Sequence, residues 1–152
     1  MFMQRSMWKP IFLATALCGT LDIVFAAILT LMRGREIPNM LRFVASGPFP
    51  AASEMGTSGA VLGLVVHFTL MAIMVAWFVI AARNVPALTD RPWLAGLIYG
   101  LITWAVMNLI VVPLRFPAAW PPKPMAIATQ LFAHVALVGL PTAYIARRYV
   151  RG

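Results

Sequence analysis

The chain has 152 residues, of which 62% are hydrophobic and 11% are charged. This composition is too apolar for an ordinary soluble domain, and the length suits one compact unit without a separate soluble domain. The formal net charge of +8 does not indicate nucleic-acid binding, because the twelve Lys and Arg residues lie at the ends of apolar runs, where they can meet lipid headgroups. We therefore expect a membrane protein whose main partner is the lipid bilayer.

Four apolar runs are long enough to cross a bilayer, since about 20 apolar residues in a helix span its hydrocarbon core. The runs cover residues 11–32, 57–82, 92–113 and 125–146. They predict an all-α fold in which residues 1–152 form a single transmembrane domain, an antiparallel four-helix membrane bundle.

The segment of residues 37–56 is the longest stretch between two predicted spans. Pro38 can begin a short helix there, and Leu41, Phe43 and Val44 would give that helix an apolar side. We predict a short interfacial helix, followed by a turn that leads into the second span.

Prolines are expected to interrupt the helices in two further places. Residues 115–124 contain four prolines and cannot be helical throughout. Pro141 lies inside the fourth span and is expected to kink it, which frees a carbonyl group one turn earlier.

The positive charges predict an orientation. Seven Lys and Arg residues share the side of the two termini and five lie on the other side, which favours both termini in the cytoplasm. The first group is Arg5, Lys9, Arg83, Arg91, Arg147, Arg148 and Arg151, and the second is Arg33, Arg35, Arg42, Arg115 and Lys123.

Each predicted span carries one polar group, namely Asp22, His67, Asn108 and His134. At a rise of about 1.5 Å per residue, the acid and the two histidines lie at similar depth, and the asparagine about one turn nearer the outer surface. An ionised Asp near the bilayer centre costs roughly 3 kcal/mol, so Asp22 is expected to have a partner, either His67 or His134. We predict that the four polar residues face the interior of the bundle as one binding cluster.

Glycines at four-residue spacing support the prediction that these polar residues face the interior of the bundle. Small residues spaced in this way allow membrane helices to approach closely. Two such rows lead to polar residues: Gly59, Gly63 and His67 in the second span, and Gly96, Gly100, Trp104 and Asn108 in the third. The single cysteine, Cys18, is interpreted as a small residue at a helix contact.

Intramembrane ionisable residues are candidates for function. We favour a non-enzymatic membrane protein whose cluster binds or conducts a proton, an ion or a small polar ligand, and we predict no catalytic residues. In one alternative, the polar residues only join the helices. In others, His67 and His134 ligate a b-type haem of an electron-transfer subunit, or Asp22, His67 and His134 hold a metal ion. The chain could also be a homo-oligomer or an accessory subunit of a larger membrane complex.

From the second span onward, the order of features resembles the YagU-like group of small bacterial inner-membrane proteins. The matching pieces are Val66-His67-Phe68, Pro86, Leu94 to Gly100, Pro113-Leu114, Pro121-Pro122, Phe132-Ala133-His134 and Arg147-Arg148. The stretches 19–22 and 42–47 look more like a broader set of uncharacterised four-span bacterial proteins. The resemblance implies four spans and a location in the bacterial inner membrane. For activity, it implies no more than a link to acid tolerance.

Overall fold

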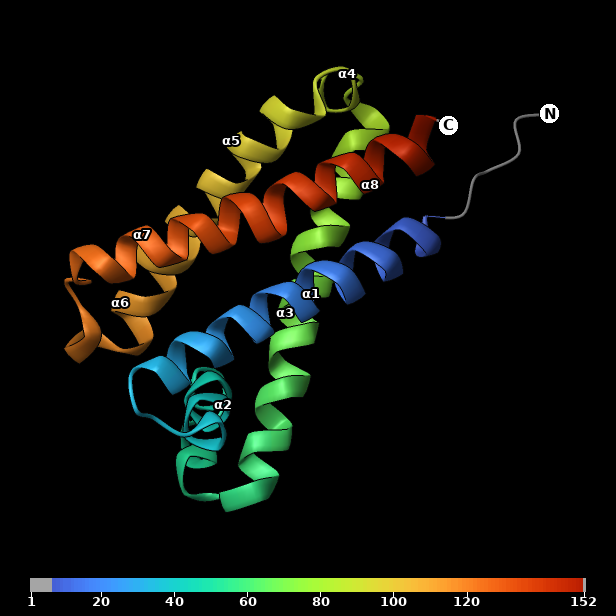
Figure 1. Ribbon diagram of the computed structural model, residues 1–152. Helices are drawn as coiled ribbons and strands as arrows, with labels where there is room; N and C mark the ends of the chain where they lie inside the picture. Colours follow the sequence, from blue (N-terminus) through green and yellow to red (C-terminus); the bar gives the residue numbers. More distant parts are fainter. Residues whose placement is uncertain (1–6, 152) are drawn as a thin grey trace.

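The computed structural model describes residues 7–151, which contain helices and connecting turns but no strand. Four helical segments have the length and apolar composition of membrane-spanning helices, which confirms the predicted all-α class. Figure 1 shows their arrangement. The first two are α1 (Trp8–Met32) and α3 (Gly56–Asn84), and the other two run from Pro92 to Arg115 and from Pro124 to Arg151.

The third and fourth long segments are each built in three parts. The third consists of α5 (Pro92–Ala105), the π-helical turn η2 (Val106–Val111) and α6 (Val112–Arg115). The fourth consists of α7 (Pro124–Phe132), the π-helical turn η4 (Ala133–Gly139) and α8 (Leu140–Arg151). Both segments begin with a proline, whose missing N–H would be unpaired at the start of any helix. The predicted spans therefore agree with the observed helices to within a few residues at most ends.

Each π-helical turn ends just before a proline. Pro113 and Pro141 have no N–H to give to the carbonyl group four residues earlier, and their rings crowd that carbonyl. The residue before each proline instead donates five residues back, Val112 to Met107 and Leu140 to Val135. A local π turn re-satisfies the backbone where a proline interrupts a membrane helix. Pro141 thus interrupts the fourth helix through a widened π-helical turn in the residues before it, Ala133–Gly139.

Shorter elements connect the long helices. They are α2 (Ile37–Ser46), the 3-10 turn η1 (Pro50–Glu54), α4 (Ala87–Asp90) and the 3-10 turn η3 (Pro117–Ala119). The predicted helix after Pro38 is present as α2, and residues 115–124 are interrupted as expected. Helix α2 packs along α3 and buries Leu41 and Ala45. A Cβ atom on Gly63 would collide with the Leu41 carbonyl group, so this glycine permits close approach of α2.

The fourth segment lies between α1 and α5 (Figure 1). It also packs directly against α3, and α1 packs against both α3 and η4. The second and fourth spans are therefore neighbours, whereas an up-and-down order around a bundle would make them diagonal and separated. Helices α3 and α5 meet through Tyr99, whose hydroxyl donates to the Met74 carbonyl at 2.6 Å.

The core lies where α1, α3, η4 and α8 meet. Val75, Val79 and Val138 are fully buried there. Cys18 is also fully buried, and its Sγ lies 3.3 Å from the Thr142 hydroxyl and 3.6 Å from the Val138 carbonyl oxygen. The interpretation of Cys18 as a helix-packing residue is thereby confirmed. Arg5, which was counted in the predicted orientation, lies outside the described residues.

Candidate intramembrane polar site

Asp22 on α1 faces His67 on α3. The Oδ2 atom of Asp22 lies 3.9 Å from Nδ1 of His67, and the two side chains are 27% and 11% exposed. The other ring nitrogen of His67, Nε2, lies 2.9 Å from the carbonyl oxygen of Gly19, which precedes Asp22 by one turn of α1. His67 therefore contacts α1 with both of its nitrogens.

The Gly19 contact determines which nitrogen of His67 carries hydrogen. A carbonyl oxygen can only accept, so Nε2 must donate, and the Nδ1 of a neutral His67 then has a free lone pair. This lone pair faces the carboxyl group of Asp22. A proton bound to either group would therefore lie beside the other, and the pair as a whole would be neutral. The pair is neutral while it holds this proton and carries one negative charge after releasing it.

His134 occupies a separate contact between the third and fourth spans. Its Nδ1 lies 3.1 Å from the hydroxyl oxygen of Thr103. That hydroxyl donates its single hydrogen to the Gly100 carbonyl at 3.0 Å, so it must accept from His134. The Nδ1 of His134 therefore carries hydrogen, and its Nε2 is left with a lone pair when the ring is neutral.

Asn108 is bonded within its own helix. Its Nδ2 donates to the Trp104 carbonyl at 3.1 Å. Within residues 7–151, no hydrogen bond or ion pair joins Asn108, His134 and the Asp22–His67 pair to one another. The structure thus brings together two of the four predicted site residues and leaves the other two in separate contacts.

The donor sets do not fit the two cofactor alternatives. Among the described residues, no three His, Cys, Asp or Glu side chains lie together in a group that could hold a metal ion, so Asp22, His67 and His134 do not share a metal site. A haem between the two histidines would need one free nitrogen from each. The free nitrogen of His67, Nδ1, faces Asp22 on α1 and not the fourth helix, and α3 packs directly against that helix.

Two contacts of the site were not predicted from the sequence, the Gly19 carbonyl and the Thr103 hydroxyl. Thr103 follows Gly100 by three residues, so it lies near the glycine row that leads to Asn108. That spacing was an available signal for Thr103. A backbone carbonyl, by contrast, is present at every residue, and no sequence pattern singles out Gly19.

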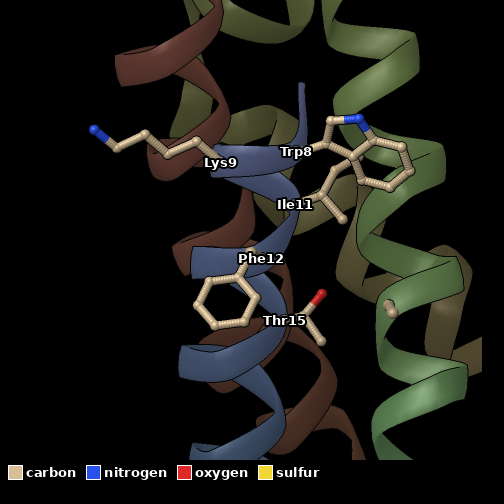
Figure 2. A pocket seen from close by; sticks show the side chains of 6 residues that line it. Trp8, Lys9, Ile11, Phe12 and Thr15 are labelled. Carbon is tan, nitrogen blue, oxygen red and sulfur yellow. The ribbon is translucent and has the colours of Figure 1, made fainter. Parts of the chain in front are cut away.

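An open groove of about 630 Å³ lies beside the first turns of α1. Figure 2 shows the side chains that line it. Its lining is mostly apolar, from Trp8, Ile11, Phe12 and Ala72, together with Lys9 and Thr15. The hydroxyl oxygen of Thr15 is buried here without a hydrogen-bond partner in the described part of the chain. Thr15 precedes Asp22 by seven residues, which is two helical turns or about 10 Å along α1.

Together these features define the class, an all-helical protein with four helices of membrane-spanning length and paired polar groups within them. No family model, curated protein or solved structure matches the chain. The resemblance to the YagU-like group therefore stays a prediction.

Proposed function

We propose that this is a small multi-pass membrane protein whose Asp22–His67 pair binds a proton inside the bilayer and passes it on. The observation that carries the proposal is the 3.9 Å approach of the Asp22 carboxyl group to a ring nitrogen of His67 that the Gly19 contact leaves free of hydrogen. The four apolar helices form the surrounding bundle, with α2 at the membrane interface.

The energetics favour a proton over a larger ion. A lone carboxylate near the bilayer centre costs roughly 3 kcal/mol on insertion scales. One bound proton removes the net charge of the pair, whether it resides on the acid or completes an imidazolium–carboxylate pair. A metal cation would instead need several oxygen or nitrogen ligands, and only one carboxylate is present in the four spans.

We also propose that the protein lies in a bacterial inner membrane with both termini in the cytoplasm. The charge distribution supports the orientation, because the ends of the first and fourth spans that share one side carry Lys9, Arg147, Arg148 and Arg151. The bacterial inner membrane is what the resemblance to the YagU-like group implies. Fusions of the C-terminus to green fluorescent protein and to alkaline phosphatase test the orientation. We expect the first fusion to fluoresce and the second to be inactive, and the reverse pattern would contradict this orientation.

Proton flux into proteoliposomes tests the function. Vesicles that contain a pH-sensitive dye, with the protein in their membrane, should acidify under a potassium-driven membrane potential faster than empty vesicles. Asp22→Asn should lower the protein-dependent rate by about tenfold or more, since an amide cannot take up the proton. His67→Gln should also lower it, because glutamine keeps a donor for the Gly19 carbonyl but cannot become protonated.

Glu54→Gln is the matched control, because Glu54 is an exposed carboxylate outside the four long helices. We expect the Glu54→Gln protein to conduct at the wild-type rate. A wild-type rate equal to that of empty vesicles would overturn conduction. An infrared pH titration tests binding separately: the conversion of carboxylate to carboxylic acid should lose one component in Asp22→Asn, which keeps those of Glu36, Glu54 and Asp90.

A further inference from the structure

A second polar site lies at the end of the molecule where the fourth long helix stops. Here the last turns of α8 meet α4, the short helix between the second and third spans. An open pocket of about 410 Å³ lies between the two elements. Its lining residues are Thr89, Asp90, Arg147, Arg148 and Arg151.

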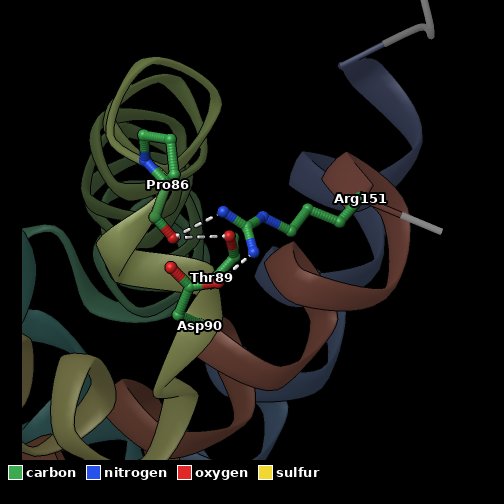
Figure 3. A network of polar contacts seen from close by, with 4 residues as sticks. All are labelled: Pro86, Thr89, Asp90 and Arg151. Atoms are coloured by element: carbon green, nitrogen blue, oxygen red, sulfur yellow. Dashed lines mark hydrogen bonds and ion pairs between the residues drawn. The ribbon is translucent and has the colours of Figure 1, made fainter.

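Arg151, one of the residues that line the pocket, joins α8 to α4. Figure 3 shows its contacts. Its guanidinium group forms an ion pair with Asp90 and also donates to the Pro86 carbonyl at 3.0 Å. The buried Thr89 hydroxyl donates to the same carbonyl at 2.9 Å. These bonds hold the C-terminal end of α8 against α4.

Of the three arginines that line the pocket, Asp90 neutralises only Arg151. The ion pairs within residues 7–151 are Asp90 with Arg151 and Asp22 with His67, so Arg147 and Arg148 have no carboxylate partner in the described chain. Both are exposed. Three guanidinium groups thus line the pocket with a single carboxylate, and its surplus of positive charge favours an anionic ligand.

We propose that this pocket binds the phosphodiester headgroup of an anionic phospholipid, held by Arg147 and Arg148. The planar fork of a guanidinium group matches two phosphate oxygens, and charge-assisted bonds of this kind are stronger than neutral ones. The pocket lies at the end of the apolar helices, where headgroups would lie. Trp93 and Tyr149 are near it in sequence, and aromatic residues favour this level of the membrane.

The location distinguishes a lipid from a soluble phosphate as the ligand. Basic pockets between membrane helices on the cytoplasmic side are a known type of site for anionic headgroups. A soluble anion would gain nothing from the adjacent apolar helix surface, whereas the acyl chains of a lipid can lie along it. The inference requires that the four helices cross a membrane, but it is independent of proton binding at Asp22 and His67.

Native mass spectrometry of the full chain in detergent tests this site. Phosphatidylglycerol and cardiolipin should bind more tightly than phosphatidylcholine. Arg147→Gln with Arg148→Gln should weaken binding of the anionic lipids by about tenfold or more, because two charge-assisted bonds are lost. The matched control, Arg33→Gln with Arg35→Gln, removes two exposed arginines that follow α1 and should bind these lipids as the wild type does.

Three results would overturn the proposal. They are equal binding of phosphatidylcholine, an equal loss in the Arg33 and Arg35 control, and competition by millimolar inorganic phosphate as effective as that by lipid. Arg147→Lys with Arg148→Lys separates binding from folding, because it keeps the charge but loses the planar fork. We expect intermediate affinity for this variant, with a melting temperature in detergent equal to that of the wild type.

Discussion

The imidazole Nδ1 of His134 and the hydroxyl oxygen of Thr103 lie 3.1 Å apart, and they join the two spans that each carry an internal proline. His134 is the second residue of the η4 turn, which precedes Pro141. A π turn adds one residue, which rotates the following helix by about 100° relative to a continuous α-helix. The side chains that meet α5 therefore depend on this turn.

Thr103→Val tests the proton position on His134. Valine has nearly the same shape but no oxygen to accept from Nδ1, so we expect the ring to redistribute between its two neutral forms. Nitrogen NMR of the His134 ring should show hydrogen on Nδ1 in the wild type and a mixture in the variant. Thr129→Val is the control, because the Thr129 hydroxyl bonds to carbonyls of its own helix. An unchanged spectrum in Thr103→Val would contradict the assigned contact.

Pro141→Ala tests the link between the proline and the π turn. Alanine restores an N–H that can donate to the Leu137 carbonyl, so η4 should revert to α-helix. The reversion would turn His134 away from Thr103. We expect the His134 ring signals to move toward those of the Thr103→Val protein. If they keep their wild-type positions, the π turn does not depend on the proline.

The Asp22–His67 pair predicts unequal effects of its two members on stability. His67→Ala removes the bond to Gly19 and leaves Asp22 without a neighbouring partner, and it should lower the free energy of unfolding by about 2–3 kcal/mol. Asp22→Ala removes the costly acid itself and should have a smaller effect, about 1 kcal/mol or less. Thermal unfolding in detergent measures both. Equal melting temperatures for the two variants and the wild type would show that the residues do not interact.

Gly100→Ala tests the close contact between the third and fourth spans. A Cβ atom at this position would lie 2.6 Å from the His134 carbonyl oxygen and from Cα of Val135. Both are backbone atoms, so we expect a loss of about 1–3 kcal/mol in the free energy of unfolding. Gly47→Ala is the control, because its nearest neighbour would be 3.4 Å away, an ordinary contact. Similar melting temperatures for the two variants would mean that the helices can separate at little cost.

The partners of the polar residues could be predicted from the sequence only in part. The need of Asp22 for a partner follows from the cost of an acid in an apolar span, and the structure places His67 beside it. The polar character of Asn108 did not predict a partner on another helix, because the amide of an asparagine can donate to a carbonyl of its own helix, as the bond to Trp104 shows. A polar residue in a span therefore requires a partner, but not one on another helix.

The glycine rows show the same limit. Gly96 and Gly100 face the fourth span, where Cβ atoms would approach the Gly139 and His134 carbonyl groups. Gly63 faces α2, which connects the first two spans, although the same spacing suggested contact between spans. Spacing reveals that a helix surface is flat enough for close approach, but not which element covers it.

The sequence by itself determined where the four long helices lie, to within a few residues at most of their ends. Apolar length, flanking charges and prolines are local properties, and a helix satisfies its backbone within its own segment. Only the tertiary structure decided which helices are neighbours and which polar groups meet. Those contacts depend on two π turns, on α2 covering one glycine row and on the fourth helix packing beside the second. Each of these contacts joins residues far apart in the chain, and its free energy depends on where both partners lie.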